Sequence, residues 1–155
     1  MNRTNAATVK TTFEDLLARD GFLVYKTRGV SMKPMLKQNR DLVVIRTPSS
    51  SLKKNDTVLY RRGQSYVLHR IIRVCEDHYL IRGDNTFRLE YVPGTEVIGV
   101  LTAFTLKGRH HDVTEKGYLI YVHIWQAIYP FRFIFFHSRC LLARIVRKIR
   151  RIIDR

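Results

Sequence analysis

The sequence is poor in the residues that define several classes of protein. Its two cysteines, Cys75 and Cys140, lie far apart without a C-x-x-C spacing, so neither a disulfide framework nor a zinc site is indicated. His110 and His111 precede Asp112, but we expect a solvated loop there. The sequence also has no internal repeat or low-complexity tract. It therefore indicates one folded domain with an appendage and predicts no metal ion or other cofactor.

A long apolar run is also missing from the first part of the chain. Residues 1–28 contain none that would suit a secretory signal or an N-terminal membrane span. The segment TTFEDLLARDG instead predicts a short amphipathic helix that begins after Thr11 or Thr12 and ends at Gly21.

Acidic residues are scarce relative to basic ones. The chain has 28 lysines and arginines against 13 aspartates and glutamates, a formal net charge of +15. Residues 107–155 hold 11 basic and 3 acidic side chains, so about half of the excess lies in the last third. Such a balance favours an anionic partner, either nucleic acid or an acidic membrane surface.

Short strand-like runs dominate the middle of the chain. FLVYKT, DLVVIRT, DTVLYRR, SYVLHRIIRV, HYLIRG and TEVIGVLTAFTL are separated by turn-forming residues, and the Arg62–Gln64 segment predicts a hairpin. We expect a mainly β fold, a small and partly closed antiparallel barrel. The predicted organisation is an N-terminal helix at 1–21, a β-rich core at 22–106 and a helical C-terminal tail at 107–155.

One turn presents a candidate nucleophile. In the run RGVSMKPMLK, which spans residues 28–37, a glycine precedes and a proline follows Ser31, so the hydroxyl is expected at a sharp turn. Most serines in turns only satisfy backbone groups. A catalytic role therefore needs a base elsewhere in the chain.

A histidine and a carboxylate supply candidates for the other roles. His69 ends the apolar run YVLH, and imidazole readily accepts a proton near neutral pH. Asp84 lies in the Gly-Asp-Asn turn that follows another strand. The alternative for His69, taken alone, is a residue without a catalytic role that ends a strand beside Arg70. The chain order Ser31, His69, Asp84 is what favours a catalytic reading.

Several blocks in this order resemble a known family. GVSMKPML, DLVVI, VLHRII, RGDN and VIGVL, within residues 22–106, resemble the catalytic core of the S24/S26 peptidases. The resemblance is to the type I signal peptidase branch that has histidine in place of lysine. It implies a serine endopeptidase that cleaves signal or leader peptides at the bacterial cytoplasmic membrane. Ordinary signal peptidases enter the membrane ahead of the serine, and residues 1–28 contain no apolar run for this, so we expect association through residues 118–155 with the inner face favoured.

The resemblance assigns roles to individual residues. Ser31 matches the acylating serine, Met32 and Pro34 match residues that shape its turn, and His69 matches the general base. Asp84 is the first choice for the acid that orients the imidazole.

Three details of this assignment depart from the family pattern or leave it open. In some relatives the acid lies several residues beyond Gly-Asp-Asn, where this chain offers only Glu90, the alternative acid. Gly29 lacks the hydroxyl that assists the oxyanion in some members of the family. Backbone N–H groups, including that of Ser31, must therefore stabilise the oxyanion. A Ser-Lys pair with Lys33 or Lys37 is disfavoured, because both read as solvated charges.

The last third of the chain suggests a membrane. Residues 118–136 are rich in Tyr, Trp and Phe, including Trp125, but Arg132 at mid-bilayer would cost roughly 2.5–3.5 kcal/mol. We expect an interfacial helix broken near Pro130, with a re-entrant hairpin as the variant. From Ser138 onward the spacing predicts a helix with an apolar stripe on one face and cations on the opposite face. The cations that would meet lipid head groups are Arg144, Arg147, Lys148 and Arg151.

Two rival functions follow from the same sequence. A self-cleaving repressor of the S24 type would need an N-terminal DNA-binding unit, and about 20 residues before the core are too few for one. A non-catalytic basic β-domain could bind membrane or nucleic acid, but it has no need for Ser31, His69 and Asp84 together. We therefore expect peptide substrates and an anionic membrane surface as partners, and we do not expect nucleic acid.

Overall fold

The structure is a computed structural model that describes residues 11–139 and Arg147. It divides into two compact units, the first ending at Val113 and the second beginning at Thr114. The predicted organisation ends the core at residue 106 instead. The difference arises because residues 109–112 add a further strand to the sheet of the first unit.

The N-terminal helix forms as predicted. Helix α1 (Phe13–Asp20) is capped by Thr12, whose hydroxyl accepts from the Asp15 N–H at 3.1 Å while the Asp15 carboxylate accepts from the Thr12 N–H at 2.9 Å. This reciprocal pair is a capping box. Gly21 ends the helix with a φ of 74°, and its N–H donates to the Leu17 carbonyl at 2.9 Å. Helix α1 packs against the first strand.

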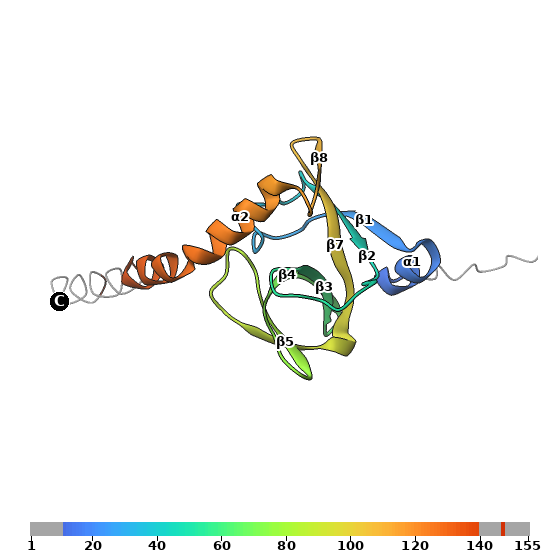
Figure 1. Cartoon of the computed structure of the whole chain (residues 1–155), viewed down its shortest axis with the longest axis horizontal. Coiled ribbons are helices and arrows are strands. Elements are labelled where there is room, and N and C mark those ends of the chain that lie inside the picture. Colours follow the sequence, from blue (N-terminus) through green and yellow to red (C-terminus); the bar gives the residue numbers. More distant parts are fainter. Residues whose placement is uncertain (1–10, 140–146, 148–155) are drawn as a thin grey trace, which may run out of the picture. The chain divides into compact units, whose positions relative to one another are not determined.

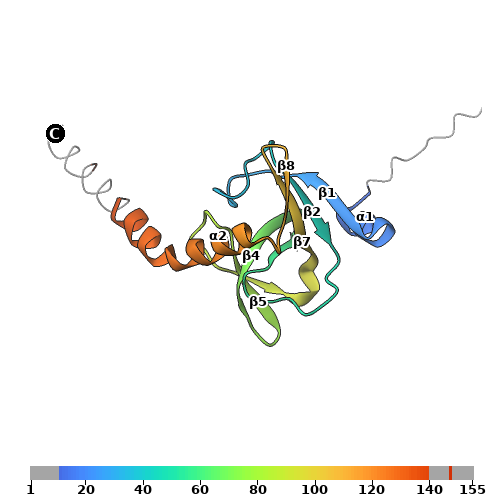
Figure 2. The same ribbon diagram turned by 45° about the horizontal axis from the view of Figure 1, so that its top comes forward.

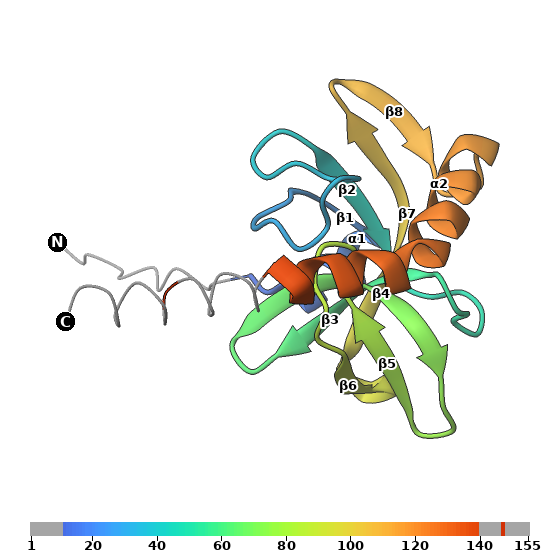
Figure 3. The ribbon, with the colours of Figure 1, turned by 90° about the vertical axis from the view of Figure 1, so that its left-hand side faces the viewer.

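The prediction of a mainly β fold is confirmed. Eight antiparallel strands form one curled, half-barrel sheet in the order β1-β2-β7-β3-β4-β5-β6, with β8 paired to β7. Figures 1 and 2 show the strands curving around a common interior, and Figure 3 shows β7 between the β1–β2 and β3–β6 groups. The strands are β1 (Phe22–Lys26), β2 (Leu42–Arg46), β3 (Thr57–Arg62), β4 (Ser65–Val74), β5 (His78–Arg82), β6 (Glu90–Pro93), β7 (Val97–Leu106) and β8 (Arg109–Asp112).

Three register shifts accompany the curvature. They lie between Val44 and Ile45, between Leu59 and Tyr60, and between Ile71 and Arg73. A bulge adds a residue to one strand of a pair and so bends it and increases its twist. The sheet can thereby wrap around its own core, which includes Val58, Tyr60, Ile71, Ile81 and Val92. The predicted hairpin at residues 62–64 is confirmed by the pairing of Arg62 with Ser65.

Two strands lie outside the predicted set. The prediction of a solvated loop at His110 to Asp112 is wrong, because these residues belong to β8 and pair with Ala103–Thr105 of β7. Strand β6 pairs with β5 and brings Glu90 opposite Ile81. Neither segment has the long alternating pattern that identifies a strand from sequence. Pairing with a neighbouring strand stabilises the extended conformation that their own residues do not specify.

The second unit contains two helices joined at a bend. Helix α2 (Lys116–Ala127) and the helix Tyr129–Arg139 meet at 49°, which confirms the predicted break near Pro130. The Arg132 guanidinium lies 3.8 Å from the centre of the Trp125 ring, so a cation–π contact spans the bend. Arg147 is helical and exposed, whereas the remaining predicted membrane-facing cations, Arg144, Lys148 and Arg151, lie outside the described residues.

No single helix within the described residues is long and apolar enough to cross a membrane. The two helices of the bent pair, taken together, are long and apolar enough for one crossing by length and composition alone.

Candidate active site

Ser31 lies in the loop between β1 and β2. Gly29 before it has a φ of 82°, a left-handed conformation that glycine adopts without a steric penalty. The turn then closes through hydrogen bonds from the Lys33 N–H to the Val30 carbonyl at 3.2 Å and from the Leu36 N–H to the Met32 carbonyl at 3.0 Å. Met32 is buried beneath this turn, whereas Pro34 is exposed on it. Gly29, Met32 and Pro34 thus occupy the turn that presents Ser31, as expected.

A buried carboxylate anchors the far end of the Ser31 loop. Asp41 is fully buried, and its Oδ2 accepts from the Lys37 N–H at 2.7 Å. Both of its oxygens also accept from the Arg40 guanidinium, at 2.6 and 2.7 Å. Burial acts to raise the pKa of Asp41, but the hydrogen bonds from Arg40 and the backbone outweigh it and lower the pKa. The loop is therefore fixed to the start of β2 by an ionised group.

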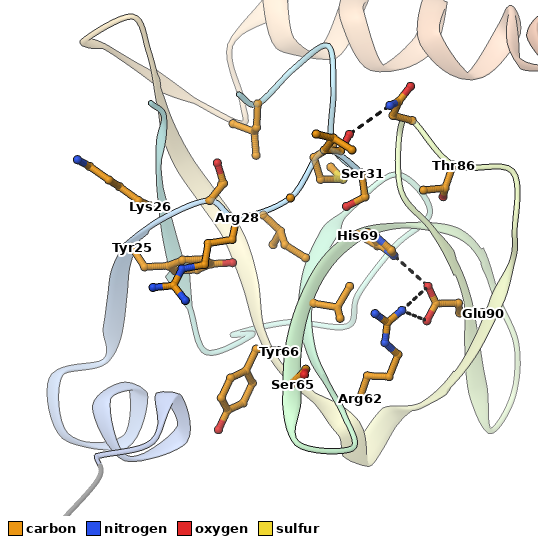
Figure 4. A pocket seen from close by; sticks show the side chains of 18 of the residues that line it. Tyr25, Lys26, Arg28, Ser31, Arg62, Ser65, Tyr66, His69, Thr86 and Glu90 are labelled. Atoms are coloured by element: carbon orange, nitrogen blue, oxygen red, sulfur yellow. Dashed lines mark hydrogen bonds and ion pairs between the residues drawn. The ribbon is translucent and has the colours of Figure 1, made fainter. Parts of the chain in front are cut away.

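The β4 strand carries His69 into the site. His69 pairs with Val58 of β3, and the residue is 4% exposed. Its Nδ1 lies 3.3 Å from Glu90 Oε1 and 3.2 Å from the Tyr60 hydroxyl. Figure 4 shows the imidazole between Glu90 on one side and the Ser31 side chain on the other. The ring is thus held at Nδ1, and its other side faces Ser31, the candidate nucleophile.

The Ser31 loop and the His69 ring meet at Gly83. A Cβ atom on Gly83 would lie 2.7 Å from the Ser31 carbonyl oxygen and 2.9 Å from His69 Nε2, both closer than side-chain carbons approach such atoms. Asn85, two residues further along the same turn, donates from its backbone N–H to the same Ser31 carbonyl at 2.7 Å. Its side-chain amide donates to the Val30 carbonyl at 3.3 Å. The Gly-Asp-Asn turn therefore fixes the Ser31 loop beside His69.

Asp84 has a partner other than the one we predicted. Its two oxygens accept from Nε and a terminal nitrogen of Arg70, both at 2.8 Å, and neither side chain is exposed. Such a bidentate pair directs the Asp84 carboxylate toward the guanidinium. The acid in contact with His69 Nδ1 is Glu90, the alternative choice. The structure thus corrects the order of preference between the two acids.

Glu90 is itself held by neighbours on β3. The Arg62 guanidinium donates to both Glu90 oxygens, at 3.2 and 3.1 Å. Burial acts to raise the pKa of Glu90, but hydrogen bonds from Arg62 and Tyr60 and the nearby His69 lower it overall. Burial raises the pKa of the Tyr60 hydroxyl, which therefore stays protonated and can donate. Glu90 is consequently an ionised acceptor at the imidazole.

These contacts define the chemistry that His69 can perform. Burial lowers the pKa of His69, and the charge of Glu90 opposes this shift only in part. The ring is therefore neutral at physiological pH. An anionic acceptor at Nδ1 favours the tautomer that carries its proton on that nitrogen. The lone pair on Nε2 then lies on the Ser31 and Gly83 side, where a general base for a serine is needed.

A donor for a developing oxyanion is also available. The backbone N–H of Ser31 donates to no other group in the described part of the chain. Lys33 and Lys37 are exposed, and neither lines the cleft around Ser31. Within residues 11–139 and Arg147, no group of three or more metal-ligating side chains is gathered.

A cleft of about 1070 Å³ contains Ser31, His69 and Glu90. One wall is formed by β1, the edge strand of the sheet, and the segment that follows it. The opposite wall is the first half of β4, including Ser65 (Figure 4). Phe13 of α1 closes one end by stacking on Tyr66 at 4.6 Å between ring centres. An extended peptide can lie along such an edge strand and donate and accept main-chain hydrogen bonds.

Three residues of the site are absent from the predicted set. Tyr60 and Arg62 read from sequence as ordinary strand residues, and Gly83 reads as a turn residue. A signal for Gly83 exists in the Gly-Asp-Asn motif itself, because a missing side chain allows two segments to approach closely. No local pattern distinguishes Tyr60 or Arg62.

Comparison with models of known protein families and with curated proteins gave no match to this chain. The relation to the S24/S26 peptidases is therefore a resemblance in sequence motifs.

Proposed function

We propose that this protein is a serine endopeptidase of the signal-peptidase type that cleaves signal or leader peptides. The observation that carries the proposal is the junction at Gly83, where the carbonyl of Ser31 and the Nε2 of His69 approach the same point. The contact between Glu90 and His69 Nδ1 supports the same reading, because a base needs an orienting group.

The proposed reaction follows acyl-transfer chemistry. Ser31 Oγ attacks the scissile carbonyl carbon as His69 Nε2 takes the hydroxyl proton, and the backbone N–H of Ser31 stabilises the oxyanion. The imidazolium then protonates the leaving amine, and the C–N bond breaks to leave an acyl-enzyme. Water, deprotonated by His69, hydrolyses that ester and regenerates Ser31. Glu90 holds the ring and balances its charge during both steps.

Cleavage of peptides by the full-length protein tests the assignment. We expect the wild type in detergent to cut members of a proteome-derived peptide library, and we expect Ser31→Ala to lose this activity while keeping its circular dichroism spectrum. Ser65→Ala is a matched control, because Ser65 also lines the cleft but has no base beside it in the proposed mechanism. Cleavage that survives Ser31→Ala would falsify the proposal and favour a non-catalytic basic domain.

We also propose that residues 118–155 hold the protein on an anionic membrane, with the inner leaflet favoured. The support is a bent pair of aromatic-rich helices followed by a strongly basic sequence. Large apolar side chains are exposed on the second helix, including Phe131, Ile134 and Phe135.

Vesicle binding tests the membrane proposal in the full chain. Glutamine at four tail positions should reduce co-sedimentation with vesicles rich in phosphatidylserine, the positions being Arg144, Arg147, Lys148 and Arg151. The matched control removes four exposed cations of the first unit, namely Lys33, Lys53, Lys54 and Arg109. Equal losses for the two variants would show that net charge alone is responsible, and the tail would then have no specific role.

A further inference from the structure

The charges that line the cleft are unbalanced. Four cationic side chains and one carboxylate contribute to its lining. The carboxylate belongs to Glu90, which already pairs with Arg62 and contacts His69. The cations that remain are Lys26, Arg28 and Arg88. With His69 neutral, the cleft therefore has a net positive charge of three.

The three remaining cations come from two segments that line the cleft. Lys26 and Arg28 lie at and just after the end of β1, and Arg88 lies in the loop between β5 and β6, beyond the Gly-Asp-Asn turn. In Figure 4, Arg28 lies on the opposite side of the cleft from Ser65 and Arg62. All three side chains are exposed, and no carboxylate of the described residues forms an ion pair with them. A ligand in the cleft would meet them as uncompensated charges.

Such an arrangement selects against positive ligands and in favour of negative ones. Cations around a concave surface reinforce one another, because field lines concentrate in a cleft with walls of low dielectric constant. Like charges brought together across an interface are strongly disfavoured, which makes electrostatics a means of specificity. The effect on a peptide would depend on its charge near the bond presented to Ser31.

We infer that the substrates of this cleft are acidic peptides, with aspartate or glutamate close to the segment bound beside Ser31. This inference rests on the proposed function and names its substrate class. A peptide is favoured over lipid or nucleic acid, because β1 is an edge strand of the sheet within the described residues, it lines the same cleft, and main-chain pairing needs an amide backbone.

Binding to a catalytically inactive protein tests the inference separately from catalysis. We would titrate full-length Ser31→Ala with dye-labelled peptides of one sequence, with small residues in the centre and Glu, Gln or Lys at the flanking positions. Fluorescence anisotropy should give about tenfold tighter binding for the Glu peptide than for the Gln peptide, and weaker binding still for the Lys peptide. The preference should shrink as salt increases. Equal affinity for the three peptides would overturn the inference.

Charge reversal at the cleft identifies the responsible residues. Added to Ser31→Ala, Arg28→Glu and Arg88→Glu should each weaken binding of the Glu peptide by about fivefold. Arg109→Glu makes the same charge change on exposed β8, outside the cleft lining, and should weaken it by less than about twofold. If Arg109→Glu weakened binding of the Glu peptide as much as Arg28→Glu and Arg88→Glu do, the preference would come from overall charge, and the inference would be overturned.

The outcomes separate this inference from the proposed function. Cleavage by the wild type without a preference for Glu over Lys would overturn the inference and leave the peptidase proposal standing. Tight, Arg88-dependent binding of the Glu peptide with no cleavage would support the inference about acidic peptides and overturn the peptidase proposal. If the Arg28 and Arg88 variants lose affinity for phosphatidylserine vesicles or single-stranded RNA but not for the Glu peptide, the cations serve those ligands and the inference is wrong.

Discussion

The Oε1 atom of Glu90 lies 3.3 Å from Nδ1 of His69, although twenty-one positions separate the two residues in the chain. Glu90 is on β6 and His69 is on β4, and β5 lies between these strands in the sheet. The contact therefore depends on how the sheet curls as well as on strand order.

We predict that Glu90→Gln greatly reduces turnover without unfolding the protein. The amide keeps the size of the side chain but can no longer balance an imidazolium, and it can present its NH₂ group to Nδ1. The expected loss in kcat is about 10²-fold to 10⁴-fold, comparable to changes at orienting acids of other serine hydrolases. Kinetics on a cleaved peptide would measure it, with Glu96→Gln as a control in an exposed pair with Arg61. Near-normal kcat would contradict the assigned role.

Asp84→Asn should act on stability. Removing the carboxylate leaves the Arg70 guanidinium buried without its charge partner, and breaking a buried ion pair costs about 3–5 kcal/mol. Urea denaturation followed by circular dichroism would report the loss in the free energy of unfolding. Asp77→Asn, which changes an exposed carboxylate, should leave that free energy nearly unchanged. An Asp84 variant as stable as the wild type would rule out a structural role for the pair.

Gly83→Ala should separate Ser31 from His69. The added methyl group would lie within 3.0 Å of atoms in both residues, and at least one segment must move to accommodate it. We expect loss of most peptidase activity and a decrease in stability of about 1–3 kcal/mol from overpacking. Gly94→Ala is the control, because its Cβ would lie 3.8 Å from Tyr79, an ordinary contact distance. Full activity in Gly83→Ala would show that the site tolerates a wider separation.

The dependence of activity on pH should follow His69. Burial lowers its pKa below the ordinary value of 6.5, so the neutral base persists to a lower pH than for a free imidazole. The unfolded chain takes up this proton first as pH falls. The His69 contribution to stability is therefore present above pH 6.5 and is lost as pH falls through the lowered folded-state pKa.

Replacing Arg62 tests the electrostatic part of this account. The charge of Arg62 lowers the pKa of both His69 and Glu90, so Arg62→Gln should shift the acidic limb of the kcat/KM profile to higher pH. NMR titration of the His69 ring in the Ser31→Ala background would show the same direction. Arg61→Gln is the matched control, since Arg61 is similarly exposed and pairs with Glu96. A shift to lower pH in Arg62→Gln, or equal shifts in both variants, would refute the explanation.

Local sequence determined much of the fold. The spacing of apolar residues and turns specified most strands of the sheet, and Thr12 and Gly21 specified the ends of α1 through bonds within a few residues. The short strands β6 and β8 could not be found this way, because their pairing partners lie elsewhere in the chain. The break near Pro130 is again local, since proline interrupts helical hydrogen bonding.

Within the candidate site, the sequence by itself determined that Ser31 lies on a tight turn and that His69 lies on a strand, because Gly29 and an apolar run set these conformations locally. Only the tertiary structure decided which acid contacts the imidazole. The sequence favoured Asp84 over Glu90, but in the structure Asp84 pairs with Arg70, while the curled sheet and Arg62 bring Glu90 to Nδ1. Contacts of this kind depend on the register of several strands at once, which no short segment encodes.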